Sequence, residues 1–171
     1  MTDFRSKIGD IGFGSMYAQF RGIATESQDA YDKVIAALHL AMDKGVRFFD
    51  TADIYASAWN KFGENELMIS DALRSWNGTA EQKSKIVIGT KAGITRGPNE
   101  TWGRNATVDY LLRAAEASAG RLGVSILDLW QHHRLDPKMG FEEQVQNLDA
   151  LRQRGIVRHI GVSNYSATQL R

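Results

Sequence analysis

Cysteine is absent from the sequence, and only two of its 171 residues are proline. Without cysteine the chain forms no disulfide framework and has no thiolate nucleophile. An excess of charge of one sign is also missing, because the formal net charge is +1, so bulk charge does not mark a nucleic-acid partner or an anionic membrane surface. No apolar run reaches the roughly 18 residues of a membrane-spanning helix, and the first residues contain no apolar signal core. We therefore expect a cytoplasmic protein with no nucleic-acid and no membrane partner.

The composition that remains is that of a folded protein. Apolar residues make up 43% of the chain, which together with the low proline content argues against disorder. A length of 171 residues is typical of one domain and is sufficient to bury a sizeable core. Residues 1–171 are therefore predicted to form a single domain.

Helical and strand patterns alternate along the chain. Apolar residues at helical spacing predict helices, and short apolar runs bounded by glycine or charge predict strands. Residues 92–106, rich in Gly and Asn, are predicted to form one long loop, of a kind that is often functional. The predicted strands are residues 8–16, 46–49, 85–90, 125–131 and 156–162. The predicted helices are residues 28–44, 69–76 and 108–122, the last of these with Thr107 as N-cap. An apolar stripe at helical spacing over residues 141–151 predicts a fourth helix, and a last helix begins at Ser166.

Alternating strands and helices at this spacing predict parallel strands joined by right-handed crossovers. Two α/β architectures are compatible with five such strands: an open doubly wound sheet and part of a (β/α)₈ TIM barrel. A complete barrel usually needs about 250 residues, more than this chain has. Topology alone favours the open sheet.

The last four of the five predicted strands share one feature, which is a polar or ionisable residue at the carboxyl end. In open α/β sheets and barrels alike, active sites are built at that edge. Tyr55 lies in the loop that follows the first of these ends. The end residues are Asp50, Lys91, the pair His132 and His133, and the pair Ser163 and Asn164.

These residue types are suited to protonating a carbonyl oxygen. A free phenol has a pKa of about 10, and an ammonium such as that of Lys91 would lower the pKa of Tyr55. Asp50 would pair with Lys91 and hold it in place, and His133 would orient a substrate oxygen. The missing reactant is a hydride, which a nicotinamide supplies. The pattern includes no metal site.

At these residues the chain resembles the aldo-keto reductase superfamily. The motifs that carry the resemblance are FFDTADIY with GENELMISDAL, then IVIGTKAG, LDLWQHHRLDP and IVRHIGVSNYS, in this order and over nearly the whole chain. The resemblance implies a (β/α)₈ barrel that binds NADP(H) in an extended form and reduces an aldehyde or ketone to an alcohol. This chemistry reverses the preference for the open sheet.

The resemblance also implies roles for individual residues. The acid–base tetrad of the family corresponds to Asp50, Tyr55, Lys91 and His133, with Tyr55 as proton donor. His133 is chosen over His132 because the catalytic histidine of the family directly precedes arginine, as His133 precedes Arg134. Cofactor-binding residues are expected to be Gly14 and Ser15 beside the ribose, Ser163 and Asn164 at the nicotinamide amide, and Asp50.

The sequence departs from the family pattern in two places. Ala56 follows Tyr55 where the family commonly has glycine. The chain also ends soon after its fifth predicted strand, so the last three βα units of a barrel are not included, nor the family's residues that stack on the nicotinamide and bind the 2′-phosphate. A five-strand arc leaves two unpaired edges. The alternative interpretation is therefore a truncated, catalytically silent half-barrel that acts only through self-association of these edges.

Overall fold

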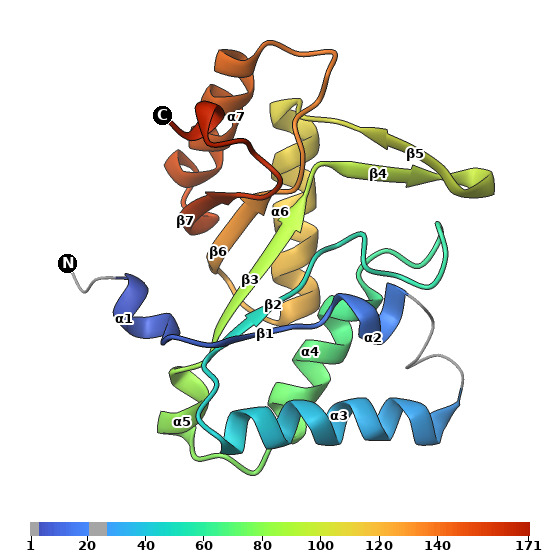
Figure 1. The fold of residues 1–171 in the computed structure, drawn as a ribbon, viewed down its shortest axis with the longest axis vertical. Helices are drawn as coiled ribbons and strands as arrows, with labels where there is room; N and C mark the ends of the chain where they lie inside the picture. Colours follow the sequence, from blue (N-terminus) through green and yellow to red (C-terminus); the bar gives the residue numbers. More distant parts are fainter. Residues whose placement is uncertain (1–3, 21–26) are drawn as a thin grey trace.

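The computed structural model describes residues 4–20 and 27–171. Five parallel strands form one sheet in the order β1-β2-β3-β6-β7, which is also their order along the chain (Figure 1). An open doubly wound sheet reverses its strand order at a switch point, and the described strands of this sheet show no such reversal. The strands are β1 (Gly12–Gly14), β2 (Phe48–Asp50), β3 (Val87–Ala92), β6 (Leu127–His132) and β7 (Val157–Val162).

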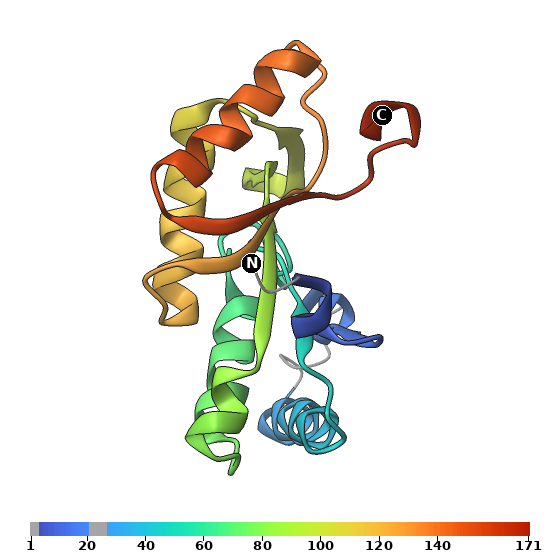
Figure 2. The same cartoon turned by 90° about the vertical axis from the view of Figure 1, so that its left-hand side faces the viewer.

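The long helices follow the strands in sequence; in Figure 2, α4, α6 and α7 lie along one side of the sheet, and α3 lies at its lower end. Each packs on the next one, α3 on α4, α4 on α6 and α6 on α7. A single helical layer on the outside of a sequentially ordered sheet is the arrangement of a barrel wall. The long helices are α3 (Gln28–Asp43), α4 (Glu64–Ser75), α6 (Val108–Leu122) and α7 (Phe141–Gln153), and the short ones are α1 (Phe4–Ile8), α2 (Met16–Phe20) and α5 (Ala80–Ser84).

The main core lies between the sheet and this helical layer. Phe49 and Trp130 of the sheet and Leu38, Ile69 and Leu111 of the helices are all buried there. The other face of the sheet is less covered. Phe48, Leu129 and His159 are half-buried on that face, and the ring of Phe4 from α1 lies 4.4 Å from the ring of His159, centroid to centroid.

Residues 92–106 are not one loop, contrary to the sequence prediction. They contain an antiparallel hairpin of β4 (Ile94–Gly97) and β5 (Thr101–Arg104), joined by the 3₁₀ turn η2 (Pro98–Glu100). The strands are short and their outer residues are polar, so the period-2 pattern that marks a strand is weak here.

Two further boundaries and one capping contact differ from the sequence prediction. Strand β1 is shorter than residues 8–16 and is flanked by α1 and α2. After Ser166 the chain forms only the 3₁₀ turn η3 (Thr168–Leu170). Thr107 stands at the N-cap of α6 but makes no capping bond with its side chain, because its hydroxyl lies 2.7 Å from Oδ1 of Asn105.

Candidate active site

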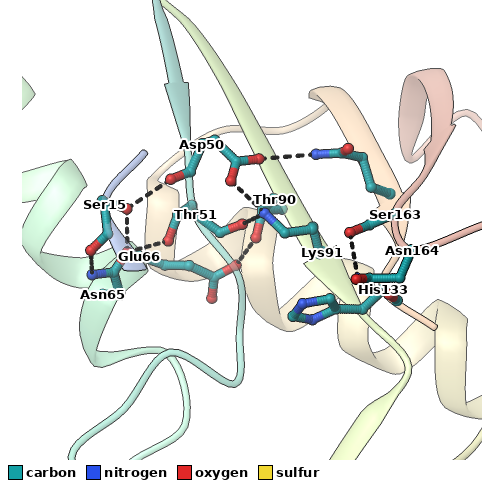
Figure 3. A network of polar contacts seen from close by, with 11 residues as sticks. Ser15, Asp50, Thr51, Asn65, Glu66, Thr90, Lys91, His133, Ser163 and Asn164 are labelled. Carbon is teal, nitrogen blue, oxygen red and sulfur yellow. Dashed lines mark hydrogen bonds and ion pairs between the residues drawn. The ribbon is translucent and has the colours of Figure 1, made fainter. Parts of the chain in front are cut away.

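The carboxyl end of β2 delivers Asp50 to the less covered face of the sheet. Asp50 pairs in register with Gly89 of β3, and Lys91 lies two residues further along β3, hence on the same face. The Lys91 ammonium donates to Oδ2 of Asp50 at 2.6 Å and to the carbonyl of Thr51 at 2.8 Å (Figure 3). The ion pair expected between Asp50 and Lys91 is therefore present.

A residue that sequence reasoning missed completes this contact. Gln131 of β6 stands opposite Lys91 in the sheet register, and its side-chain amide donates to Oδ1 of Asp50 at 3.1 Å. The sequence contained a signal, because Gln131 lies two residues before His133 at the end of a predicted strand. Three adjacent strands thus fix one carboxylate.

Lys91 is a buried cation, with a side chain that is 4% exposed. Burial lowers the pKa of the Lys91 ammonium, and the charge of Asp50 opposes this shift. Removing one partner of a buried ion pair leaves an uncompensated charge, which is strongly destabilising. Asp50 and Lys91 therefore depend on each other.

Tyr55 lies in the loop between β2 and α4, packed beside Ala52 and Ile54. The Lys91 nitrogen lies 5.1 Å from the centroid of the Tyr55 ring. The ring of His133 meets the ring of Tyr55 edge-on, with centroids 5.6 Å apart and an angle of 81° between the planes. No residue in the described part of the chain hydrogen-bonds the Tyr55 hydroxyl, which is thus available to a ligand.

The pKa of Tyr55 shifts in the direction opposite to the sequence prediction. Burial, followed by the negative charges of Asp50 and Asp53, raises the pKa of the Tyr55 phenol to about 12. The prediction that Lys91 lowers it is wrong for this structure, because the carboxylate of Asp50 offsets the ammonium and the phenol has lost its water. Tyr55 therefore carries its proton at neutral pH.

His133 is buried at the end of β6, and its backbone N–H donates to the carbonyl of Ala92 at 2.9 Å. Burial, and then the positive charges of Lys91 and Arg134, lower the pKa of His133 to about 3. The imidazole is thus neutral at physiological pH. Its Nδ1 is buried without a partner among the described residues.

Ser15 follows β1, and its hydroxyl is buried in an internal network. It lies 2.7 Å from the carbonyl of Asp50 and 2.5 Å from Oδ1 of Asn65, which also accepts from Thr51 at 2.6 Å (Figure 3). This network joins the ends of β1 and β2 to the first turn of α4. A Cβ at the neighbouring Gly14 would meet no atom within 4 Å, so the space beside the expected ribose-binding segment is open.

Ser163 and Asn164 lie at the end of β7, tied to the end of β6. The backbone N–H of Ser163 donates to the carbonyl of His132 at 2.9 Å. The Asn164 amide donates to the carbonyl of His133 at 3.1 Å and to the Ser163 hydroxyl at 2.8 Å. The pair is therefore positioned directly beside His133.

His132, adjacent to His133, makes a different set of contacts. It is fully buried, and its Nδ1 lies 2.7 Å from the hydroxyl of Tyr165. Burial lowers the pKa of His132 to about 4, with Asp136 opposing the shift. Its Nε2 has no partner in the described part of the chain. His132 thus links the end of β6 to the loop after β7.

A second buried polar cluster lies beneath the Tyr55 loop. Glu66 is fully buried, and its carboxylate accepts from Thr90 and from Arg121, each at 2.5 Å. Burial and the charge of Glu66 raise the pKa of the nearby Asp53 well above its usual range. Sequence reasoning missed this cluster, because nothing local distinguishes these side chains from exposed ones.

The β4–β5 hairpin is attached to the Tyr55 loop by Arg96 and by Glu100, whose carboxylate accepts from the backbone N–H of Trp59 at 3.0 Å. Arg96 donates to the carbonyls of Ala56 at 2.8 Å and Ser57 at 3.4 Å. It also pairs with Glu100 and lies 5.0 Å from the centroid of the Trp102 ring. Ala56, where the family commonly has glycine, thus contributes its carbonyl to the attachment of the hairpin.

Metal-binding clusters and membrane-spanning helices are both absent from residues 4–20 and 27–171. No group of three or more His, Asp or Glu side chains there could hold a metal ion. None of the helices in this part of the chain is both long enough and apolar enough to cross a membrane.

Comparison with known proteins gives consistent matches. The model of the Aldo/keto reductase family matches residues 10–171. An uncharacterised oxidoreductase of Schizosaccharomyces pombe is 33% identical over 171 residues, which cover 96% of this chain and 51% of the relative. A 6-dehydroglucose reductase of Novosphingobium aromaticivorans is 36% identical over 134 residues, which cover 78% of this chain and 42% of the relative.

Two solved structures have the same fold over nearly the whole chain. A glycerol dehydrogenase from Gluconobacter oxydans has a TM-score of 0.76 and 28% identity, covering 93% of this chain and 46% of that one. The holo form of an aldo-keto reductase from Bacillus halodurans has a TM-score of 0.71 and 25% identity, covering 91% and 46%. These matches confirm the barrel type of fold. The chain spans about half the length of the relatives it matches.

Proposed function

The chain belongs to the aldo/keto reductase family, and we propose that it takes part in the NADP(H)-dependent reduction of an aldehyde or ketone to an alcohol. The observation that carries the proposal is the Tyr55 hydroxyl, which no described residue binds, on a ring whose centroid lies 5.1 Å from the Lys91 nitrogen. The proposal includes a cytoplasmic location, in keeping with the absence of cysteine.

The residues expected at the nicotinamide are suited to a carboxamide. The Ser163 hydroxyl accepts a bond from Asn164, which leaves its own proton free to be donated. Oδ1 of Asn164 has no donor among the described residues and can accept. One donor and one acceptor side by side are what a carboxamide requires. When bound there, the nicotinamide supplies the hydride that the reaction needs.

In this proposal the residues of the chain control the carbonyl oxygen. Tyr55 donates its proton as negative charge develops on that oxygen, because an alkoxide is a stronger base than a phenolate. The neutral imidazole of His133 holds and orients the carbonyl oxygen. Because it carries no positive charge, it does not compete with Tyr55 as the proton donor. Lys91, fixed by Asp50, places its ammonium 5.1 Å from the centroid of the phenol ring, where it offsets part of the negative charge of Asp50 when the proton leaves.

Substitution of Tyr55 by phenylalanine tests the proposal. Tyr55→Phe keeps the ring contacts with Lys91 and His133 and removes only the proton donor. We expect reduction of a simple aldehyde with NADPH to fall at least a hundredfold, by the usual contribution of a general acid. Binding of NADPH, followed by quenching of its fluorescence, should be unchanged.

One control variant makes the result specific. Tyr110→Phe alters a hydroxyl that makes only a 3.5 Å contact with the carbonyl of Ile94 and should retain activity. If the unsubstituted chain bound no NADPH, the proposed cofactor would be wrong. If Tyr55→Phe reduced the aldehyde at the original rate, the assignment of Tyr55 as proton donor would be wrong.

Self-association is a second candidate property, favoured by one edge of the sheet. Among the described strands, β7 has a neighbour on one side only, and a groove of about 460 Å³ lies between it and α7. Val145 and Leu170 line this groove and are 45% and 63% exposed. An exposed strand edge beside an apolar surface favours pairing with another copy. The alternative function is a catalytically silent half-barrel that acts only through this contact.

Light scattering after gel filtration distinguishes the alternatives. If β7 mediates association, Val145→Lys with Leu170→Lys should shift the chain toward monomer. Leu40→Lys, at a site on α3 that is 58% exposed, is the matched control and should leave the mass unchanged. A monomeric unsubstituted chain would contradict the self-association candidate.

A further inference from the structure

A small pocket opens where the β4–β5 hairpin meets the end of β6. Its volume is about 290 Å³. Its lining is Ile94, Trp102, Gly103, Arg104 and Arg134. Two of these residues are arginines and none is acidic, so the pocket has a positive lining.

The pocket adjoins the candidate active site on two sides. Ile94 packs against the cluster that contains Tyr55. Arg134 directly follows His133 in the chain. Tyr55 and His133 do not line the pocket themselves, but Ile94 and Arg134 connect it to the phenol and the imidazole that are proposed to act on the carbonyl.

Most of the guanidinium donors in the pocket have no partner in the described part of the chain. Arg104 donates one N–H to the carbonyl of Leu135 at 3.0 Å. Neither Arg104 nor Arg134 forms an ion pair within residues 4–20 and 27–171. Asp136 is the acidic residue closest to Arg134 in the sequence. Its carboxylate accepts instead from the backbone N–H groups of Lys138 at 2.9 Å and Ala106 at 3.4 Å.

The hairpin supplies an apolar wall beside these charges. Ile94 stands opposite Arg104 and Arg96 opposite Trp102 in the hairpin register, so the four side chains lie on one face of the hairpin. The Trp102 indole is 52% exposed and stacks with Arg96, whose charge is neutralised by Glu100. The anchored Arg96 thereby holds the indole beside the pocket.

From this arrangement we propose that the carbonyl substrate carries a carboxylate, which binds Arg104 and Arg134 while its apolar part lies against Trp102 and Ile94. A planar guanidinium matches a carboxylate in a two-bond geometry. The inference rests on the proposed function, since it places the carbonyl at Tyr55 and His133. It goes beyond that function by naming the charge of the substrate.

A matched pair of probes tests the inference on the 171-residue chain. The anionic probe is 4-oxobutanoate, and butanal is its neutral counterpart with the same four-carbon backbone. Binding is followed by the NMR signal of the Trp102 indole N–H, identified by its loss in Trp102→Phe. We expect 4-oxobutanoate to bind at least tenfold more tightly than butanal, as charge-assisted bonds predict.

Arginine variants locate the effect. Arg104→Gln and Arg134→Gln should each weaken binding of 4-oxobutanoate about tenfold and leave butanal unaffected. Arg134→Lys keeps the positive charge but loses the planar guanidinium that can form two bonds. Its affinity for 4-oxobutanoate should lie between those of the unsubstituted chain and Arg134→Gln. Arg113→Gln removes the same charge from the exposed face of α6 and is the matched control, with no expected change. Thermal unfolding of each variant verifies that it is folded.

The outcomes separate this inference from the proposed function. Equal affinity for the two probes, or an equal loss of affinity in Arg113→Gln, would overturn the inference. Tight binding of 4-oxobutanoate without NADPH-dependent reduction would support the carboxylate site and count against the proposed function. Reduction of both aldehydes with the same kcat/KM would support the function and overturn the inference.

Discussion

Gln131 and Asp50 come from strands separated by β3, yet the Gln131 amide donates to Oδ1 of Asp50 at 3.1 Å. The other carboxylate oxygen is bound by Lys91 at 2.6 Å. Each oxygen thus has its own donor, and the plane of the carboxylate is fixed. Because Lys91 is positioned by this carboxylate, Gln131 positions Lys91 indirectly.

Gln131→Leu should show this role. The substitution keeps roughly the same volume and removes the donor, so we expect a loss of about 1 kcal/mol in the free energy of unfolding and a lower kcat with little change in KM. Urea unfolding and steady-state reduction of an aldehyde measure the two effects. Gln153→Leu, which removes an exposed contact with Asp149 on α7, should change neither; an unaltered kcat in Gln131→Leu would contradict the positioning role.

Tyr165→Phe should loosen the loop that carries Ser163 and Asn164. The change removes the 2.7 Å bond to Nδ1 of His132 and leaves a fully buried imidazole with neither ring nitrogen satisfied by a described residue. An unsatisfied buried polar group costs about 1–3 kcal/mol. Hydrogen exchange of the Ser163 amide should accelerate, and the NADPH affinity should fall. Unchanged exchange at Ser163 would show that the loop is held without Tyr165.

Acid should destabilise the fold through its two adjacent histidines. The pKa values of His132 and His133 are lowered to about 4 and about 3, from an ordinary value of about 6.5. Their contribution to stability is complete above pH 6.5 and is lost as the pH falls toward 4. In this range the two imidazoles bind protons in the unfolded chain but stay neutral in the folded chain. At pH 5 the loss is on the order of 2 kcal/mol for each histidine.

Urea unfolding at pH 7.5, 6.5 and 5 measures this loss. Asp53 acts in the opposite direction, because its raised pKa makes it favour the folded state as the pH falls. Asp53→Asn removes this opposing contribution, and in that variant we expect stability to decrease from pH 7.5 to pH 5. Adding His132→Asn should flatten this pH dependence; equal stability of Asp53→Asn at pH 7.5 and pH 5 would refute the prediction.

Gly63 and Gly45 both have positive φ, and substitution by alanine is expected to destabilise the fold more at Gly63. At Gly63, with φ of 82°, an added Cβ would lie 2.1 Å from Cδ of Arg121, the partner of Glu66. At Gly45, with φ of 87°, it would meet no atom within 4 Å. Gly45→Ala should therefore cost only the backbone strain of about 1–2 kcal/mol, and Gly63→Ala clearly more, as judged by urea unfolding. Equal costs would show that Arg121 can move aside.

Much of the fold could be predicted from the sequence, because local patterns determine it. The helical stripe of α3 and the apolar run of β3 each reflect which face of an element is buried. The alternation of such elements implies parallel strands, and parallel strands bring their carboxyl ends to one edge. Asp50, Lys91, His133 and the Ser163–Asn164 pair could therefore be assigned to one site from their positions in the sequence.

What escaped prediction depends on contacts between distant parts of the chain. The β4–β5 hairpin has a weak local pattern and is attached by Arg96 to the carbonyl of Ala56, some forty residues earlier in the sequence. The same applies to Tyr165 and its buried bond to His132. Such contacts leave no periodic signal in the sequence.

The sequence by itself determined which ionisable groups stand at the strand ends, and only the tertiary structure decided their protonation. Lys91 beside Tyr55 predicted a lowered phenol pKa, but burial and Asp50 raise it to about 12. The physical reason is that a pKa depends on lost hydration and on all nearby charges together. Residue identity gives the charges that are present, whereas their distances and their exposure to water exist only in the folded chain.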